Sequence, residues 1–363
     1  MASFPRSLIL AALALPALCA AAPQYLATPI GAPASGEVRA INNRGDIAGH
    51  VLAAGSIPNA VLSRGASWRN FHPEGAVGSF ATGVNDAATV SGYLDVGGGR
   101  TRAVTFGAGG LADIGVFGAR GPGSSVAAAI NRHGQVAGSS DLPNSTARHA
   151  FRFTPGQALL DLGTLGGANS AASGINAQGD IVGRADTAGG AYHAFHYSGG
   201  VMRDLGTLGG TFSEASAIND SAEISGFSYL AGNTFAHAFL LAGGVLRDLG
   251  TLGGANSFGY GINNRGQVVG SSEVAGSNAL HAFLYAEGVM LDLNALIGPA
   301  FPWVLNYAAG INDAGQLAAF GCNALSQCQG FLLSPVPEPG AAALLLLGLA
   351  VMGLARRRAI SSS

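Results

Sequence analysis

Residues 174–183 read Gly-Ile-Asn-Ala-Gln-Gly-Asp-Ile-Val-Gly, and residues 261–270 repeat the pattern as Gly-Ile-Asn-Asn-Arg-Gly-Gln-Val-Val-Gly. The Ile/Val-Asn pair within this motif occurs seven times, with successive spacings of 43, 46, 45, 43, 44 and 49 residues, at Asn42, Asn85, Asn131, Asn176, Asn219, Asn263 and Asn312. Seven copies across residues 24–335 give a repeat of about 45 residues. A period of this size is typical of repeat architectures in which neighbouring units share a core.

Two further motifs keep the same phase. His-Ala-Phe begins at four positions, each 44 residues after the last: His149, His193, His237 and His281. Asp-Leu-Gly-Thr-Leu-Gly-Gly occupies residues 161–167, 204–210 and 248–254, and fades to Asp-Leu-Asn at residues 292–294. The pattern resembles the HAF family of extracellular repeats, named for that His-Ala-Phe, although the first two repeats and the last depart from it. The resemblance implies an extracellular repeat protein and supplies no activity.

Each repeat is predicted to form four short strands. In the clearest copy we expect strands at residues 172–176, 180–185, 193–198 and 201–207. The Asn-x-x-Gly turn joins the first two, because Asn and Gly accept positive φ, and a Gly-Gly pair joins the last two. Such tight turns impose antiparallel hairpins, whereas a parallel β-helix needs longer crossovers. The sequence therefore predicts an all-β fold, a seven-bladed β-propeller of four-stranded antiparallel blades over residues 24–335.

The last repeat supplies only three strands, ending near residues 331–334. Residues 25–31, Tyr-Leu-Ala-Thr-Pro-Ile-Gly, resemble the missing fourth strand. We expect this N-terminal segment to complete the last blade and close the ring, hiding the strand edges that an open array would expose.

Composition excludes several classes of function. The chain of 363 residues has 57 Gly, 48% hydrophobic and only 10% charged residues, as expected for many short strands joined by tight turns. All 18 basic residues are Arg, which excludes catalysis by a P-loop, Schiff-base or kinase-type lysine. Without its two terminal segments the chain carries 14 Arg against 19 acidic residues. A net charge of −5 argues against nucleic-acid binding.

The N-terminus is predicted to be a secretory signal peptide over residues 1–21. Arg6 precedes an apolar run at residues 8–22 that is too short to span a membrane well and ends in small residues. Cleavage is expected near residues 20–21. Cys19 allows a lipoprotein as the alternative, although the residues before it lack the small side chain that a lipobox requires.

The C-terminus carries a three-part pattern within residues 336–358. Pro337-Glu338-Pro339 precedes an apolar run at residues 340–355, which is followed directly by Arg356-Arg357-Arg358. As a transmembrane helix this run would span about 24 Å, the short limit for a bilayer, and the arginines would hold its end in the cytoplasm. The pattern resembles the PEP-CTERM sorting signal of Gram-negative bacteria. The resemblance implies export by the secretion machinery, processing by an exosortase, and delivery to the membrane, cell surface or extracellular matrix; a plain tail anchor is the alternative.

With Cys19 removed in the signal, Cys322 and Cys328 form an even pair in an oxidising compartment. We expect a disulfide that closes one loop, with two free thiols as the alternative. Two Cys without a nearby His do not make a zinc site.

The periodic histidines suggest a metal at first sight, but equivalent positions on different propeller blades lie too far apart to share one ion. Counting back from the Gly-Gly turn pairs Phe195 with Asp204, which makes His193 and Asp204 diagonal neighbours on one face of the sheet. We therefore expect a structural His–Asp brace in each blade that has both residues, formed by His149, His193, His237 and His281 with Asp161, Asp204, Asp248 and Asp292. No metal and no cofactor is expected.

No catalytic motif is present: the sequence lacks Gly-x-Ser-x-Gly and His-Glu-x-x-His, and its carboxylates fall mostly at repeat-equivalent positions. Symmetry is expected to break mainly at the chain ends, where the non-repetitive aromatics are Trp68, Phe301, Trp303, Tyr307 and Phe320. They could form a sugar-binding patch, but repacked cores of the terminal blades are the favoured interpretation.

The sequence thus predicts an exported, surface-sorted, non-catalytic propeller that serves as an interaction or extracellular-matrix module. Surface polysaccharide is a candidate partner, because the sorting signal accompanies exopolysaccharide and biofilm systems in its family. The alternatives are an enzyme acting on polysaccharide at the mouth of the central channel, and a purely architectural envelope protein.

Overall fold

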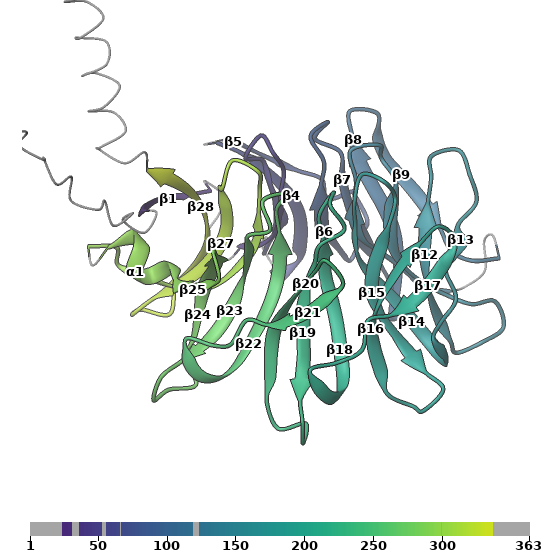
Figure 1. Cartoon of the computed structure of the whole chain (residues 1–363). Helices are drawn as coiled ribbons and strands as arrows, with labels where there is room; N and C mark the ends of the chain where they lie inside the picture. The colour runs from purple at the N-terminus through teal and green to yellow at the C-terminus, as the bar shows by residue number, and fades with distance from the viewer. Residues whose placement is uncertain are drawn as a thin grey trace, which may run out of the picture.

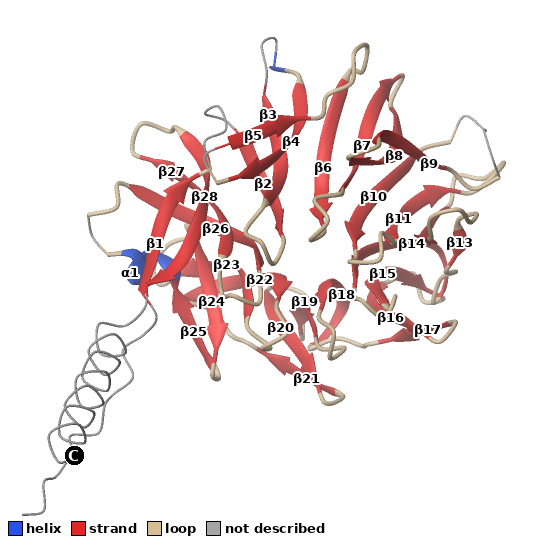
Figure 2. Ribbon diagram, turned by 90° about the horizontal axis from the view of Figure 1, so that it is seen from above, coloured by secondary structure: helices blue, strands red, loops and turns tan. Residues whose placement is uncertain are grey.

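A computed structural model describes residues 24–30, 36–52, 56–65, 67–118, 123–298 and 300–336. Its strands form seven four-stranded antiparallel sheets, arranged radially around a central channel (Figures 1 and 2). The prediction of an all-β, seven-bladed propeller is confirmed. The expected signal peptide, sorting residues and transmembrane helix lie outside the described residues. Within the described ranges, no helix has the length and apolar character needed to cross a membrane.

The first three blades have the following strands, in order from the channel outward. Blade 1 comprises β2 (Gly36–Ile41), β3 (Ile47–Leu52), β4 (Pro58–Arg64) and β5 (Ser67–Asn70). Blade 2 comprises β6 (Gly78–Val84), β7 (Val90–Gly97), β8 (Arg100–Gly107) and β9 (Gly110–Gly115). Blade 3 comprises β10 (Ser125–Ile130), β11 (Val136–Asp141), β12 (Arg148–Phe153) and β13 (Leu160–Asp161).

The other four blades follow the same order. Blade 4 comprises β14 (Gly166–Ile175), β15 (Ile181–Thr187), β16 (Tyr192–Ser198) and β17 (Val201–Asp204). Blade 5 comprises β18 (Gly209–Ile218), β19 (Ile224–Leu230), β20 (Ala236–Ala242) and β21 (Val245–Asp248). Blade 6 comprises β22 (Gly253–Ile262), β23 (Val268–Val274), β24 (Leu280–Ala286) and β25 (Val289–Asp292), followed by the short helix α1 (Leu293–Ile297). Blade 7 comprises β26 (Trp303–Ile311), β27 (Leu317–Asn323), β28 (Cys328–Val336) and β1 (Gln24–Pro29).

The expected boundaries in blade 4 differ by three residues or more at two ends and by one or two residues at four others. The inner strand begins at Gly166 rather than residue 172, because Gly166 already pairs with Thr187 of the second strand. The outer strand ends at Asp204 rather than residue 207, since its pairing with β16 stops there. Both differences place the Gly-Gly of the Asp-Leu-Gly-Thr-Leu-Gly-Gly motif at the start of the next inner strand.

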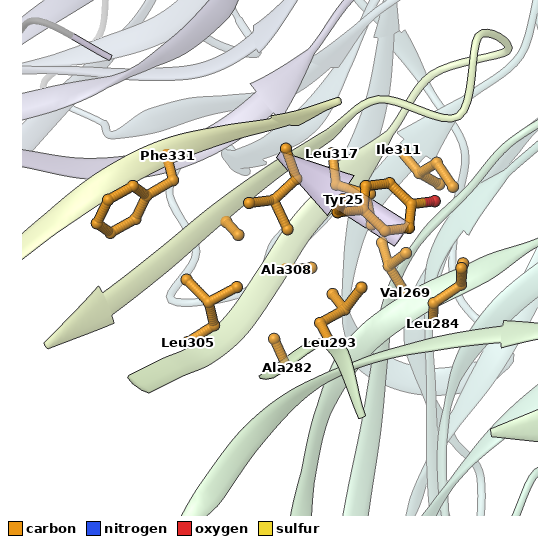
Figure 3. Packing of buried hydrophobic residues seen from close by; sticks show 12 residues of the cluster. Tyr25, Val269, Ala282, Leu284, Leu293, Leu305, Ala308, Ile311, Leu317 and Phe331 are labelled. Carbon is orange, nitrogen blue, oxygen red and sulfur yellow. The ribbon is translucent and has the colours of Figure 1, made fainter. Parts of the chain in front are cut away.

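The N-terminal strand closes the ring, as the sequence predicts. β1 pairs antiparallel with β28, from Gln24 opposite Val336 to Pro29 opposite Phe331. Tyr25 is 5% exposed and packs in the blade 7 core with Leu305 and Phe331 (Figure 3). The first and last described strands of the chain thus lie side by side (Figure 2).

A buried asparagine in each repeat joins neighbouring blades near the channel axis. The side-chain Nδ2 donates to the backbone carbonyl of the equivalent asparagine in the next blade, at 2.9–3.2 Å, and Asn312 completes the circle by donating to Asn42 at 3.0 Å. Each Oδ1 accepts the backbone N–H four residues later, which holds the Asn-x-x-Gly turn. We call these seven residues the asparagine ring, and the side of the wheel on which they lie the turn face.

Buried serines join the blades nearer the opposite side, which we call the entrance face. Ser213 of β18 accepts from the backbone N–H of Ala194 at 2.9 Å and donates to the carbonyl of Gly206 at 2.6 Å, both in or directly after blade 4. Three other inner strands repeat this pair of bonds, through Ser125, Ser170 and Ser257. Between these seams the phenylalanine of His-Ala-Phe is fully buried in blades 3 to 6, and each such burial stabilises the fold by about 1.5–3 kcal/mol.

Deletion of residues 24–31 should destabilise the wheel strongly. The shortened chain loses the strand that covers β28 and the buried ring of Tyr25, so we expect a loss of about 3 kcal/mol or more, or oligomers formed through the freed edge. Calorimetry and light scattering measure both effects, with a chain that begins at Gln24 as the reference. A monomer with unchanged Tm would contradict closure by β1.

Candidate binding site at the channel entrance

All seven inner strands carry a β-bulge at the same place, three residues before the ring asparagine. A bulge leaves one residue without a partner and re-aims its side chain. The bulged residues line a cavity of about 210 Å³ in the channel, and they are Arg39, Thr82, Ala128, Ser173, Ser216, Tyr260 and Ala309. Their side chains differ from blade to blade, although the backbone repeats.

The channel narrows one residue after the bulges, on the side toward the asparagine ring. The next residue in every inner strand is small, because neighbouring strands converge there: a Cβ on Gly174 would lie 3.1 Å from Cα of Ala217, and one on Gly261 would lie 2.9 Å from Cα of Gly310. The residue after that is always Ile or Val, at positions 41, 84, 130, 175, 218, 262 and 311. These seven residues form an apolar ring that lines both the 210 Å³ cavity and a second cavity of about 340 Å³ at the turn face.

The polar groups of the turn-face cavity are used largely for structure. Asp313 accepts from the backbone N–H of Asn264 at 2.9 Å and from the side-chain amides of Asn264 and Asn43. Asp86 and Asp220 each accept a backbone N–H from the blade before. Across the described residues, no three His, Cys, Asp or Glu side chains are placed to hold a metal ion.

Repeat symmetry breaks most strongly at the entrance face, five residues before the ring asparagine. The inner-strand residues in this row are Glu37, Phe80, Val126, Ala171, Glu214, Phe258 and Tyr307. Their partners on the second strands are His50, Tyr93, Ser139, Arg184, Phe227, Ser271 and Phe320. The expectation that symmetry breaks mainly at the chain ends misses this row.

A charged pair between two aromatic pairs stands out at the entrance face. In blade 1, Arg39 donates to the Glu37 carboxylate at 2.7 Å, and the two side chains are 53% and 42% exposed. Blade 1 contacts blades 2 and 7, and both present stacked aromatic rings, with centroids 4.7 Å apart in blade 2 and 5.3 Å apart in blade 7. We call this set the entrance platform: Glu37, Arg39, His50, Phe80, Tyr93, Tyr307 and Phe320.

A side cavity of about 340 Å³ opens beside the charged pair, lined by Arg39, His50, Phe80, Thr82 and Tyr93 among others. His50 lies edge-on to Phe80, with centroids 5.1 Å apart. Its Nδ1 is buried and has no hydrogen-bond partner among the described residues. A buried polar atom without a partner is uncommon and makes this cavity a candidate for a ligand's hydroxyl group.

Burial sets the protonation of the platform. Burial raises the pKa of Tyr93 and Tyr307, and at Tyr307 the Glu37 carboxylate raises it further, so both hydroxyls remain donors at neutral pH. Burial also lowers the pKa of His50, which Glu37 partly opposes, so the imidazole is neutral at pH 7. The only full charges on the platform are those of the paired Glu37 and Arg39.

The four expected His–Asp contacts are present within their blades. Nδ1 of the histidine lies 2.7–2.9 Å from the aspartate carboxylate in blades 3, 4, 5 and 6. Phe195 pairs with Asp204 in the expected register, and Asp204 also accepts the backbone N–H of Gly206. The structure does not bring the four pairs together into one site, and their contribution to stability stays a prediction.

The other expected residues are placed as follows. Cys322 and Cys328 form a disulfide across the β27–β28 hairpin, with the sulfurs 2.02 Å apart. Pro337, Glu338, Pro339, Arg356, Arg357 and Arg358 lie outside the described residues.

The five non-repetitive aromatics separate into three groups. Phe301 and Trp303 pack edge-on against the buried Phe331, as expected for a repacked blade core. Tyr307 and Phe320 instead stack at the entrance platform. Trp68 is 40% exposed on the outer strand of blade 1.

Sequence reasoning missed several residues of this site, among them Glu37, Arg39 and Tyr260. The signal that could have found them is a column comparison of the seven repeats, aligned on the ring asparagine. The columns three and five residues before it hold charged and aromatic residues in some repeats and small ones in others.

Comparison with known proteins identifies the C-terminal motif. Residues 335–359 match the PEP-CTERM protein-sorting motif, which implies export, exosortase processing and sorting to the cell surface. Among curated proteins, none has detectable sequence similarity to the chain.

Solved structures resemble the chain at low identity. TolB from Acinetobacter baumannii has 11% identity and a TM-score of 0.48, covering 70% of this chain and 63% of its own. The SapL1 lectin, solved in complex with alpha methyl fucoside, has 11% identity and a TM-score of 0.39, covering 85% of this chain and 98% of its own. The WD40 β-propeller domain of Doa1 has 11% identity and a TM-score of 0.45, covering 87% of this chain and 98% of its own. At 11% identity and TM-scores below 0.5, these similarities do not indicate a ligand for this chain.

His50 should titrate below the ordinary histidine value of about 6.5. Because the unfolded chain binds this proton at higher pH than the folded one, the stability linked to His50 is complete above pH 6.5 and is lost as the pH falls toward the folded pKa. NMR titration of the imidazole measures the pKa directly, and His50→Phe should lose less stability than the parent chain between pH 7 and pH 5. A folded-state pKa of 6.5 or higher would contradict burial as the main influence on this imidazole.

Proposed function

We propose that this chain is an exported, surface-sorted, non-catalytic propeller that binds surface polysaccharide through the entrance platform. The sorting motif supports the location, because it implies delivery to the cell surface. The observation that supports binding is the Glu37–Arg39 pair held between two aromatic stacks. Kinship of the repeats with extracellular HAF proteins is part of this proposal, on the strength of the in-phase His-Ala-Phe and Asp-Leu-Gly-Thr motifs.

The platform has the chemistry that a sugar ring requires. A pyranose has faces of C–H groups, which pack on aromatic rings, and an edge of hydroxyls, each both donor and acceptor. Arg39 supplies donors in a planar fork and Glu37 supplies acceptors, so adjacent hydroxyls can bond to both at once. Binding sites of this kind combine apolar walls with a few placed polar groups.

The absence of catalysis is proposed from the arrangement of the carboxylates. Hydrolysis of a glycosidic bond uses two carboxyl groups on either side of it, one of which holds a proton. In the entrance row, Glu37 is ion-paired with Arg39 and Glu214 with Arg184 at 3.1 Å. They belong to blades 1 and 5, which are not neighbours in the ring.

A polysaccharide hydrolase is the second candidate, and one observation favours it. Burial raises the pKa of Glu214, an effect that its ion pair with Arg184 opposes. A raised pKa is the property that a general acid needs at neutral pH. Turnover has to be measured alongside binding for this reason.

Calorimetry against purified envelope and matrix polysaccharides tests the proposal, with release of reducing sugar measured on the same panel. We expect binding without product, and a loss of affinity of about tenfold or more in Glu37→Gln and Arg39→Met, since each removes one charged hydrogen-bonding partner. Trp68→Ala and Arg247→Met are matched controls on outer strands and should leave affinity within about twofold.

Three outcomes would contradict the proposal in different ways. Product formation would favour the hydrolase. Binding that Trp68→Ala abolishes while the platform variants retain it would move the site to the outer edge of blade 1. An absence of both binding and turnover across the panel would favour an architectural protein.

A further inference from the structure

We infer that the entrance platform recognises the ends or short branches of a neutral hexose polymer, because the site opens into a polar pit that is bounded on its far side by an apolar ring. This inference rests on the proposed function and specifies which part of the polysaccharide is bound. Its basis is the shape of the channel and the balance of charge around it.

The channel has an apolar waist between its two cavities. Small residues allow neighbouring inner strands to approach closely here, since a Cβ on Gly83, Gly174 or Gly261 would lie 2.9–3.3 Å from a Cα of the next inner strand. The apolar ring of Ile and Val lies directly below, and the asparagine ring follows one residue later. A hydroxyl-rich chain that threaded this waist would lose its hydration against apolar side chains with no polar partner in return.

The pit above the waist is polar. Its 210 Å³ cavity is lined by the guanidinium of Arg39 and by the hydroxyl residues Thr82, Ser173, Ser216 and Tyr260, from five different blades. The entrance platform lies at the rim of this cavity. The side cavity beside His50 adjoins the rim next to blades 1 and 2. An internal segment of a polymer needs a groove that is open at both ends, whereas a polar pit that ends at an apolar ring favours an end or a short branch.

The charges favour a neutral ligand. The bulged residues, the row five residues before the ring asparagine and its second-strand partners together hold four charged residues. These form two ion pairs, Arg39 with Glu37 and Arg184 with Glu214, so they leave no net charge for an anionic or cationic sugar. The remaining groups are hydroxyls, aromatic faces and a neutral imidazole. These groups match hydroxyls and C–H surfaces.

Defined oligosaccharides of glucan, galactan and mannan, from two to eight units, provide the probes. We expect at least one series to bind, with affinity that rises over the first two or three units and then stays within about twofold. Blocking the terminal hydroxyls at the bound end should reduce affinity at least tenfold. Calorimetric stoichiometry should remain at a fixed number of protein molecules per chain, set by its ends, as the chain lengthens.

A matched pair of variants in blade 4 tests the pit itself. Ser173→Phe fills the pit and should weaken binding at least tenfold, whereas Ala177→Phe places the same ring on the other side of the waist and should change affinity less than twofold. Circular dichroism and Tm establish that both variants are folded. If only Ser173→Phe unfolds, Ser216→Phe replaces it.

The outcomes separate this inference from the proposed function. Affinity or protein loading that grows with chain length, together with indifference to end blocking, overturns end recognition and leaves polysaccharide binding intact. Equal losses in Ser173→Phe and Ala177→Phe would show that ligand passes the waist, which also overturns it. Failure of all three neutral series overturns the assignment to neutral hexose, and failure of the whole polysaccharide panel overturns the proposed function.

Discussion

The ring of seven asparagine side chains is the interaction on which the rest of the molecule depends. Each side chain closes its own turn through Oδ1 and reaches the next blade through Nδ2, so local and long-range structure share one residue. Only an amide of this length offers both an acceptor and two donors at the required distance from the backbone. The bond from Asn312 to Asn42 joins residues 270 positions apart and makes the ring continuous.

The two faces of the wheel differ in how their side chains are used. Side chains on the turn face hold the fold, whereas those on the entrance face differ from blade to blade. On the turn face, side chains next to the asparagines are also occupied by bonds between blades, as Asp313 shows. At the entrance face the inner strands are held by serines set further out, and the bulged residues vary between blades, although Thr82 also donates to the carbonyl of Ala127 in blade 3 at 2.9 Å. Charged and aromatic residues can therefore replace small ones there without cost to closure, and binding residues are carried on a rigid frame.

The repeat period, the antiparallel hairpins, the N-terminal closing strand, the disulfide and the His–Asp contacts could all be predicted from the sequence. Each follows from local rules: a turn motif, a spacing, or a count along two paired strands. A comparison of the repeats could have marked the variable positions of the candidate site, but not the direction of their side chains, because that direction depends on a bulge. One extra residue in each inner strand decides that Arg39 and Tyr260 face the channel, and a pattern of hydrophobic residues does not show such a shift in register. The sequence also does not predict the helix α1. This helix replaces the Gly-Thr part of the repeat motif, and the Asn294 side chain there exchanges two hydrogen bonds with the backbone of Leu305 in the next blade.

The free energy of unfolding of Asn219→Ala, measured in urea, tests this account most directly. The substitution leaves the part-buried N–H groups of Ser221 and Glu223 without their acceptor. It also removes the link from blade 5 to the buried carbonyl of Asn263, which keeps only its bond from the N–H of Gly266. We expect a loss of about 2–4 kcal/mol, against less than about 0.5 kcal/mol for Asn278→Ala in an exposed turn. Equal stability of the two variants would show that the wheel is held by its apolar seams alone and would contradict the role given to the ring.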